Sequence, residues 1–215
     1  FHEHLVYEDE VVTIGAIFIQ HSIQCAGYVV KEKSMINMNV KLLTEKYGLQ
    51  PGIIYGQLVR QKSIEHEGQI IHLSEVSTQT PGRTIAILGD TCNPSAVAPY
   101  IQDCDVLVHE ATGVQADRDY ILQTFHSTGA MAGEFAKKVR AKHLILNHFS
   151  PRNSINNVPC DEATYQRLIL KEAKEAAGPD VLVTAAYDHL AIPIPKRFAK
   201  DAIDSLFSSS SNNKL

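Results

Sequence analysis

Short apolar runs that alternate with amphipathic helical segments are the feature that most constrains the fold of this chain. Three runs, residues 83–88, 106–108 and 143–146, have the length and the apolar character of buried strands. Helical patterns cover about residues 127–140, between the second and third runs, and about residues 161–177, after the third. Strands that alternate with helices in this order predict an α/β layered fold.

Both ends of the chain contain further recognisable segments. Residues 11–19 are rich in β-branched side chains and predict a strand, and residues 27–30 predict a second one after a polar break. Residues 181–184 and 190–192 are expected to be the closing strands. Residues 208–215 are polar and of low complexity, so we expect them to be disordered.

The buried runs end abruptly in ionisable side chains. Asp90 follows the first run, His109 and Glu110 follow the second, and His148 follows the third. Because sites in α/β sheets form at the carboxyl ends of strands, we expect these side chains to converge. Gly89, directly before Asp90, allows the backbone to turn closely there.

Two further histidines stand at breaks in the pattern. His21 lies between two strand-like segments, and His126 lies just before a helix N-cap predicted at Ser127. Imidazole and carboxylate are the ligands that zinc accepts when sulfur is absent, so the set favours a hydrolytic metal site. Taken singly, a histidine at a strand end is more often a hydrogen-bonded surface residue, and Asp90 followed by Thr91 could simply be a turn. Three such strand ends in one chain are much less easily explained as accidents, so both interpretations stay open at this point.

The composition excludes several classes of protein. A chain of 215 residues with 44% apolar residues can bury one core. Its net charge, 20 − 24 = −4, excludes a uniformly basic nucleic-acid coat but leaves a local basic patch open. No stretch approaches the run of about 18 apolar residues that would span a membrane. The four cysteines form no C-x-x-C pair, so neither a disulfide scaffold nor a cysteine-ligated zinc finger is expected.

A basic segment interrupts the pattern at residues 31–63. It carries six basic residues against two acidic ones, a local balance of 6 − 2 = +4. A short helical pattern over residues 40–47 is followed by a break at Pro51-Gly52. We interpret the segment as an insertion whose charge suggests an anionic partner, while a solvated surface hairpin without a partner remains an equal alternative. The basic residues are Lys31, Lys33, Lys41, Lys46, Arg60 and Lys62.

Four motifs in sequence order carry a resemblance to a known family. They are Gly89-Asp90-Thr91, His109-Glu110-Ala111-Thr112, His126-Ser127-Thr128 and His148-Phe149-Ser150-Pro151-Arg152. Together they strongly resemble the ribonuclease Z family, the tRNA 3′-end processing endonucleases of the metallo-β-lactamase superfamily. The resemblance covers nearly all of residues 11–195. It implies a four-layer αββα metallo-β-lactamase sandwich, with this chain as its C-terminal part and a flexible arm inserted.

The resemblance implies a role for each residue of the site. His21 and His148 would bind different zinc ions, and Asp90 would bridge the two metals. His126 would be the general acid that protonates the leaving 3′ oxygen, and Glu110 would hold it in place. Such proton transfer typically contributes about 10²- to 10⁴-fold to the rate.

The same resemblance implies contacts with the RNA. Ser150 and Arg152 would lie near the terminal nucleotide, while the inserted segment would grip the tRNA. Asn153 stands where the family usually has an aromatic residue, which removes the basis for expecting base stacking there. The residues of the inserted segment expected to bind the substrate are Lys41, Lys46, Gly52 and Tyr55.

One family motif is missing from the sequence. The motif His-x-His-x-Asp-His supplies most of the family's zinc ligands, and Phe1-His2-Glu3-His4-Leu5 imitates only its first half. We interpret His2 and His4 as non-ligands. Because the chain starts without methionine, we expect it to be a piece of a longer protein. It would then give each zinc ion two protein ligands, where catalytic zinc usually takes three, so we expect the chain alone to bind zinc poorly and not to cleave RNA.

Two rival functions stay open at this point. A non-catalytic remnant would keep the fold and the basic arm and bind RNA or a partner subunit. A hydrolase of the same superfamily would act on a small ester or lactam, but a small substrate needs no basic arm. Retention of the histidines and carboxylates together argues against long decay, and the absent motif argues for it.

These inferences give an overall expectation. Residues 1–207 would form a partial metallo-β-lactamase-like domain, with residues 31–63 as the arm and residues 208–215 as the tail. The parent protein would use two Zn²⁺ ions to remove the 3′ trailer from precursor tRNA. The resemblance also implies a homodimer. We expect a cytoplasmic or nuclear protein without a membrane segment, and an organellar location stays open.

Overall fold

The computed structural model describes residues 4–151, 154–156 and 158–195, and the chain divides into two compact units. The first, which we call the sheet unit, comprises the residues up to Glu32 and those from Arg83 to Ile194. The second comprises Lys33–Gly82 together with Pro195, and we call Lys33–Gly82 the inserted unit. The predicted tail, residues 208–215, lies outside the described residues.

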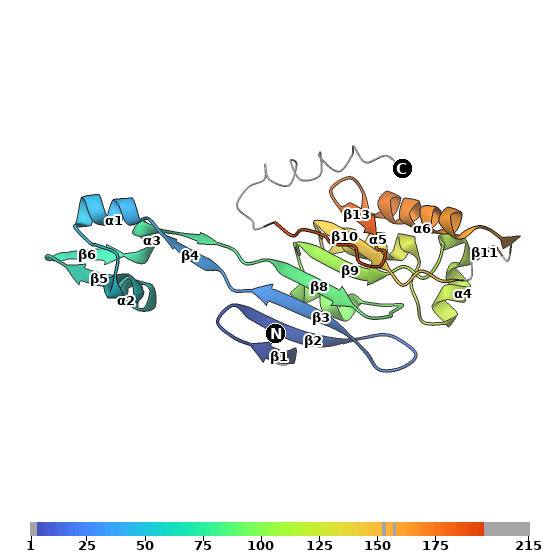
Figure 1. Cartoon of the computed structure of the whole chain (residues 1–215). Helices are drawn as coiled ribbons and strands as arrows, with labels where there is room; N and C mark the ends of the chain where they lie inside the picture. Colours follow the sequence, from blue (N-terminus) through green and yellow to red (C-terminus); the bar gives the residue numbers. More distant parts are fainter. Residues whose placement is uncertain (1–3, 152–153, 157, 196–215) are drawn as a thin grey trace. The chain divides into compact units, whose positions relative to one another are not determined.

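A seven-stranded mixed sheet forms the sheet unit, in the order β1-β2-β3-β8-β9-β10-β13 (Figure 1). Strands β8, β9, β10 and β13 are parallel to one another, whereas β2 and β8 are both antiparallel to β3, which lies between them. Strand β2 therefore runs in the same direction as β8, β9 and β10. The strands are β1 Leu5–Glu8, β2 Val12–Ile19, β3 Cys25–Glu32, β8 Thr84–Leu88, β9 Val106–Glu110, β10 His143–Asn147 and β13 Leu182–Ala185.

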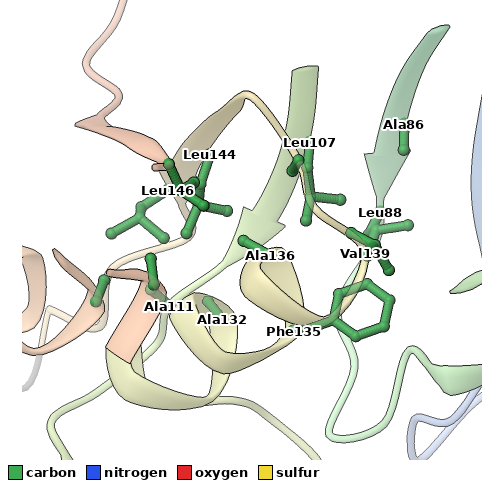
Figure 2. Close-up of a cluster of buried hydrophobic side chains, with 14 of the residues drawn as sticks. Ala86, Leu88, Leu107, Ala111, Ala132, Phe135, Ala136, Val139, Leu144 and Leu146 are labelled. Carbon is green, nitrogen blue, oxygen red and sulfur yellow. The ribbon is translucent and has the colours of Figure 1, made fainter. Parts of the chain in front are cut away.

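One face of this sheet holds the main core. Apolar residues in register across five strands are buried on it, and α5 (Gly129–Lys138) packs against them with Ala132, Phe135 and Ala136 (Figure 2). The row on the opposite face is also apolar except for Thr184, and it is partly exposed. Apolar residues on both faces are typical of strands that are buried on both sides. The buried row is Val29, Ala86, Leu107, Leu144 and Val183, and the opposite row is Tyr28, Ile87, Val108, Ile145 and Thr184.

Two glycines allow α5 to approach α6 (Glu162–Ala177) closely. A Cβ atom on Gly129 would lie 2.4 Å from the carbonyl oxygen of Ile169, and one on Gly133 would lie 2.3 Å from that of Ala173. Both distances are shorter than any real contact, so no larger residue fits at these positions without moving α6. The backbone contact fixes the two helices as one layer against the sheet.

The predicted helices and strands are largely confirmed, with two corrections. Helix α6 covers the predicted range, and its N-cap Asp161 accepts a hydrogen bond from the Thr164 N–H at 2.9 Å. Helix α5 starts later than predicted because Thr128, not Ser127, is its N-cap and accepts from the Met131 N–H. The closing strand expected at residues 190–192 is wrong, since this stretch has no strand partner and lies between turns and prolines.

Short elements complete the sheet unit. They are the 3₁₀ helices η2 (Ser95–Tyr100) and η3 (Gln115–Asp117), the helix α4 (Arg118–Gln123), and the strands β11 (Ser154–Ile155) and β12 (Val158–Pro159). All four cysteines are free thiols, as expected. In the part of the chain that the structure describes, no helix has both the length and the apolarity to cross a membrane.

The inserted unit has a small core of its own. Its elements are β4 (Met35–Met38), α1 (Val40–Tyr47), α2 (Ile53–Gln61), β5 (Ser63–His66), β6 (Gln69–His72), α3 (Leu73–Val76) and β7 (Ser77–Thr80). Helix α1 matches the predicted helix. Strand β4 pairs with β7, and β5 pairs with β6. The buried side chains that hold these elements together are Leu43, Leu49, Leu58, Ile64, Ile71, Leu73 and Val76.

The inserted unit is larger than the arm predicted at residues 31–63. It ends at Gly82 because β6, α3 and β7 return the chain to β4. Over Lys33–Gly82 there are five basic residues against four acidic ones, so the predicted excess of +4 belongs to the part up to Lys62 and not to the whole unit. The added acidic residues are Glu65, Glu67 and Glu75.

The two ends of the inserted unit meet at the sheet. The Glu32 N–H donates to the Arg83 carbonyl at 2.9 Å, and Lys31 pairs with Thr84 in the antiparallel ladder of β3 and β8. The Arg83 guanidinium forms a bidentate ion pair with the Glu32 carboxylate. The insertion therefore leaves and rejoins the sheet at one point.

The structure thus has a mixed α/β fold, as predicted. Among the described residues it contains one large sheet with helices on one face and three two-stranded sheets. The four-layer αββα arrangement has a second large sheet, and it stays a prediction. The division of the chain into a partial domain with an arm and a tail also stays a prediction.

Candidate active site

Four strands deliver the predicted site residues to one edge of the sheet. Strands β2, β8, β9 and β10 run in the same direction, and His21, Asp90, Glu110 and His148 lie at or just beyond their carboxyl ends. His126 reaches the same edge from the turn between α4 and α5. The structure therefore brings together all five residues predicted for catalysis and metal binding.

Gly89 permits the turn that places Asp90. A Cβ atom at this position would lie 2.6 Å from the Cys25 Sγ atom and 3.3 Å from the Ala26 carbonyl oxygen. A larger residue here would have to displace Cys25, so glycine permits the close approach of the chain to β3 that the sequence predicts.

The Glu110 carboxylate is buried, with 1% of its surface exposed, and it accepts hydrogen bonds from five donors. Oε1 accepts from the Thr91 N–H at 2.8 Å and from His126 Nδ1 at 2.9 Å. Oε2 accepts from the Ser127 N–H at 3.1 Å, from the Thr112 N–H at 3.3 Å and from the Thr112 hydroxyl at 2.6 Å. Since a carboxylate offers about four lone-pair positions, Glu110 has none left for a metal ion and acts as an anchor for its neighbours.

His126 lies between the other two site histidines. Its ring stacks on that of His148, with the centroids 5.1 Å apart, and meets that of His21 edge-on at 4.9 Å. Because Nδ1 is bound to Glu110, the free nitrogen is Nε2, which is the atom available for proton transfer.

Backbone strain next to His126 helps to orient His21. Phe125 has φ +60°, a left-handed conformation that is costly for an aromatic residue. In this conformation its carbonyl oxygen lies 2.9 Å from His21 Nδ1 and accepts a hydrogen bond from it. The Nε2 atom of His21 is therefore left free to bind a ligand.

His148 is oriented in the same way. Its Nδ1 atom lies 2.9 Å from the Thr112 hydroxyl, and its Nε2 atom lies 3.4 Å from Asp90 Oδ2. The residue has φ +56°, so a second left-handed turn stands at this edge of the sheet.

His109, the first residue of the second motif, is buried in the core against Phe135 and does not reach the site. Its Nδ1 atom donates to the Glu110 carbonyl oxygen at 2.7 Å, and its Nε2 atom has no hydrogen-bond partner. Burial lowers the pKa of His109, so the ring is neutral and supports the backbone of Glu110.

Known proteins with similar sequences belong to the family that the four motifs resemble. Ribonuclease Z of Cyanothece sp. is 33% identical to the chain over 195 residues, which are 89% of this chain and 58% of that protein. Ribonuclease Z of Bacillus subtilis is 32% identical over 197 residues, or 90% of this chain and 60% of that protein. The chain is a homologue of ribonuclease Z, within the metallo-β-lactamase superfamily. No model of a known protein family matches it.

A solved structure supports the same relationship. The crystal structure of human tRNase Z, short form, aligns with a TM-score of 0.51 at 26% identity and covers 89% of this chain and 46% of that one. This ribonuclease Z homologue spans about 60% of the length of the curated relatives that it matches.

Two groups of side chains in the homologue have the spacing of a metal site. The ligand atoms of His21, Asp90 and His126 lie within 4.8 Å of one another, and so do those of Glu110, His126 and His148. The five hydrogen bonds to Glu110 argue against the second group. His126 is held by Glu110, which leaves His21, Asp90 and His148 as the residues available to a metal ion.

These three residues fit zinc. The His148 and Asp90 atoms that face each other both carry lone pairs, and they are 3.4 Å apart. Two ligands that are each about 2.1 Å from a tetrahedral zinc ion are also separated by about 3.4 Å. His21 and His148 both have Nδ1 bound to oxygen, as is usual for zinc-binding histidines.

The structure describes only part of the predicted RNA-binding set. The Ser150 N–H donates to the Thr112 carbonyl at 3.0 Å, so this residue does lie beside the site, whereas Arg152 and Asn153 lie outside the described residues. His4, predicted as a non-ligand, contacts the ring of Tyr100 edge-on. The roles of Ser150 and Arg152 in RNA binding stay predictions.

The predicted arm residues of the homologue lie in the inserted unit. Lys41 and Lys46 are exposed on α1, and Gly52 is the N-cap of α2. The Tyr55 hydroxyl donates to the Leu49 carbonyl at 3.1 Å, so it braces the loop between the two helices. Lys31 and Glu32, which were counted with the arm, belong to β3 of the sheet unit.

Several residues of the site were missed in the sequence. Thr91 is fully buried, and its N–H donates to Glu110. Its hydroxyl donates to the Gln20 carbonyl at 2.9 Å, and its own carbonyl accepts from the Ser127 hydroxyl at 2.6 Å. Thr112 has a comparable position on the other side of Glu110. Both threonines stand in the recognised motifs, and that was the only signal that could have found them.

Proposed function

We propose that this chain supplies part of a dinuclear zinc endoribonuclease that removes the 3′ trailer from precursor tRNA. The observation that carries the proposal is the Glu110–His126 hydrogen bond, set beside His21, Asp90 and His148 at one edge of the sheet. A proton donor next to a metal-binding edge is what hydrolysis of a phosphodiester requires. The parent protein would have the four-layer αββα sandwich of its superfamily.

The metal would be held by residues from three strands. His21 would bind one zinc ion and His148 the other, while Asp90 would bridge them. When bound, zinc would act as a Lewis acid on the scissile phosphate and lower the pKa of the attacking water.

His126 would complete the reaction as the general acid. The bond from phosphorus to the 3′ oxygen of the tRNA breaks as the water oxygen binds to phosphorus. The water releases one proton to the solvent, and the Nε2–H of His126 gives its proton to the departing 3′ oxygen. Glu110, which accepts from Nδ1, fixes the direction of the imidazole ring and leaves Nε2 as the nitrogen that faces the substrate. The products are a tRNA with a free 3′ hydroxyl and a trailer that keeps the phosphate.

The inserted unit would hold the tRNA. Lys41, Lys46, Arg60 and Lys62 are exposed on or directly after its two longer helices, and lysine and arginine are the usual phosphate contacts. Ser150 and Arg152 would contact the terminal nucleotide.

The test is cleavage of a precursor tRNA with a 3′ trailer by the full-length protein in the presence of zinc. We expect release of the trailer and a tRNA with a 3′ hydroxyl, and we expect a chelator to abolish the reaction. A zinc-loaded full-length protein that left the precursor intact would refute the proposal.

A second function has a specific observation in its favour. With the ligand assignment proposed above, the chain would supply His21 and Asp90 to one ion and His148 and Asp90 to the other, which is one protein ligand fewer than catalytic zinc usually has. The chain by itself would then be a non-catalytic module that binds RNA or a partner subunit. Zinc titration of the 215-residue chain separates the two cases, since two tight zinc sites would contradict this second function.

A further inference from the structure

A single hydroxyl group connects the proton donor to a metal-binding residue. The Thr112 Oγ1 atom lies 2.6 Å from Glu110 Oε2 and 2.9 Å from His148 Nδ1. The threonine is 9% exposed, and its amide and carbonyl groups are also hydrogen-bonded, to Glu110, Ser127 and Ser150. Thr112 therefore links Glu110 and His148 directly, through one oxygen atom.

The direction of the two hydrogen bonds follows from the number of protons. A hydroxyl has one proton, and the ionised carboxylate of Glu110 can only accept. The proton of Thr112 therefore goes to Glu110, and the oxygen lone pair of Thr112 must accept the Nδ1–H of His148. A neutral His148 then carries its proton on Nδ1 and its free lone pair on Nε2, the atom that faces Asp90.

We propose that Thr112 is a positioning residue, which selects the Nδ1–H tautomer of His148 and ties this ligand to the carboxylate that holds His126. This inference rests on the proposed function in that it takes His148 to be a zinc ligand. It adds that Glu110 positions both histidines. It accepts directly from the general acid His126, and it accepts from the Thr112 hydroxyl that holds the metal ligand His148.

The hydrogen bond between the Thr112 hydroxyl and His148 Nδ1, which we call the tether, is important because of the surroundings of His148. The side chain of His148 is 45% exposed, and stacking on His126 restrains the plane of its ring but not which of its two nitrogens faces Asp90. Without the hydroxyl, the ring would be free to rotate and either nitrogen could carry the proton. Loss of a residue that orients a metal-binding histidine typically lowers metal affinity about 10- to 100-fold.

The variant that tests the tether is Thr112→Val, which keeps the shape of the side chain and removes the hydroxyl. Thr112→Ser restores the hydroxyl and should restore the wild-type behaviour. Thr184→Val is the matched control because the Thr184 hydroxyl also bonds a histidine, His143, at 2.8 Å, within the same sheet but away from the site. If the valine variant does not fold, Thr112→Ala also lacks the hydroxyl and takes its place.

The first measurement is the tautomer of His148, read from ¹⁵N chemical shifts of the metal-free chain at about pH 8, where an ordinary imidazole is neutral. We expect a single Nδ1–H tautomer in the wild type, in Thr112→Ser and in Thr184→Val, and a mixture of tautomers in Thr112→Val. A purely structural role of Thr112 in packing would not move this signal.

The second measurement is the zinc affinity of the full-length protein, by competition with a chelator. We expect a loss of about 10- to 100-fold in Thr112→Val and wild-type affinity in the serine and control variants. Both changes together support the tether, and either one without the other overturns it. Failure of the wild-type protein to cleave precursor tRNA would refute the proposed function and leave the tautomer result intact.

Discussion

The two units of the molecule differ in how their residues are brought together. The inserted unit is built from neighbouring segments: β5 and β6 form a hairpin, and a core of seven side chains holds them with α1 and α2. The site of the sheet unit joins residues from 21 to 148, each held by hydrogen bonds to distant segments. The comparison teaches that the two units are stabilised separately, by a local core in one and by long-range hydrogen bonds in the other. The RNA binding and the chemistry that we propose would then be carried by different parts of the chain, and five experiments can test this division.

The largest effect should come from His126→Ala in the full-length protein. Because its proton is given up only in the transition state, kcat should fall by about 10²- to 10⁴-fold while the affinity for precursor tRNA stays nearly constant. Single-turnover kinetics and a binding assay measure the two quantities. A variant that lost tRNA affinity instead would contradict the assignment of RNA binding to the inserted unit and of catalysis to the sheet unit.

The next largest effect should come from removing a core leucine in each unit. Leu58 and Leu144 are both fully buried, so either substitution to alanine should cost about 2–5 kcal/mol. Leu58→Ala should raise amide exchange only within residues 33–82, and Leu144→Ala should raise it across the sheet unit. Exchange that rises in both units for either variant would show that they unfold as one.

Acid should weaken the sheet unit through His143. Burial lowers the pKa of this histidine to about 4, against about 6.5 in an unfolded chain. The unfolded chain therefore binds the proton more readily between these values, so the stability is complete above about pH 6.5 and falls as the pH approaches 4. We expect the free energy of unfolding of the wild type to fall by about 3 kcal/mol over this range, as measured by urea unfolding. In His143→Gln the slope in this range should be smaller, and an equal slope would contradict the assignment.

Removal of the inserted unit should separate binding from chemistry. Since Lys31 and Thr84 are paired in an antiparallel ladder, Glu32 and Arg83 can be joined by a two-residue Asn-Gly turn. In the full-length protein we expect an affinity loss of about 100-fold for precursor tRNA and a shallower salt dependence, with hydrolysis of a small phosphodiester retained. The milder variant Lys41→Gln/Lys46→Gln should reduce the salt slope by about two. Unchanged tRNA binding with unchanged salt dependence would show that the inserted unit does not bind RNA and is a surface insertion without an RNA partner.

The smallest effect should come from Phe125→Gly. Glycine adopts the left-handed conformation of this residue without strain, and the carbonyl that accepts from His21 is kept. Relief of the strain should offset the lost side chain, so the free energy of unfolding should rise by no more than about 1 kcal/mol and should not fall. Chemical denaturation measures the change, and a clear decrease would show that the aromatic ring itself supports the site.

Much of the sheet unit could be predicted because its strands are short apolar runs. The convergence of Asp90, Glu110 and His148 followed from the rule that parallel strands end at one edge. His21 joins them because β2 is parallel to β8, which only the pairing of both with β3 reveals. The cap of α5 was placed one residue early because serine and threonine are comparable N-caps.

Other features leave no local signal. Strand β7, Ser77–Thr80, contains only polar residues, and its partner β4, Met35–Met38, is only four residues long, so nothing in the pattern marks where the inserted unit ends. The hydroxyls of Thr91 and Thr112 bond to residues far along the chain, and threonine at such positions has no periodicity. The strain at Phe125 was also invisible, since glycine and asparagine are the residues that mark a left-handed turn.

The meeting of Glu32 and Arg83 has a consequence for the order of folding. Pairing β3 with β8 requires closure of a loop of about 50 residues, whose entropic cost grows with its free length. A loop that has already collapsed onto Leu43, Leu58 and Ile71 presents its two ends side by side, so most of this cost is met before the strands pair. We therefore expect the inserted unit to form first and the long-range sheet to follow, which would make the local hairpin β5–β6 a determinant of how fast the distant strands find each other.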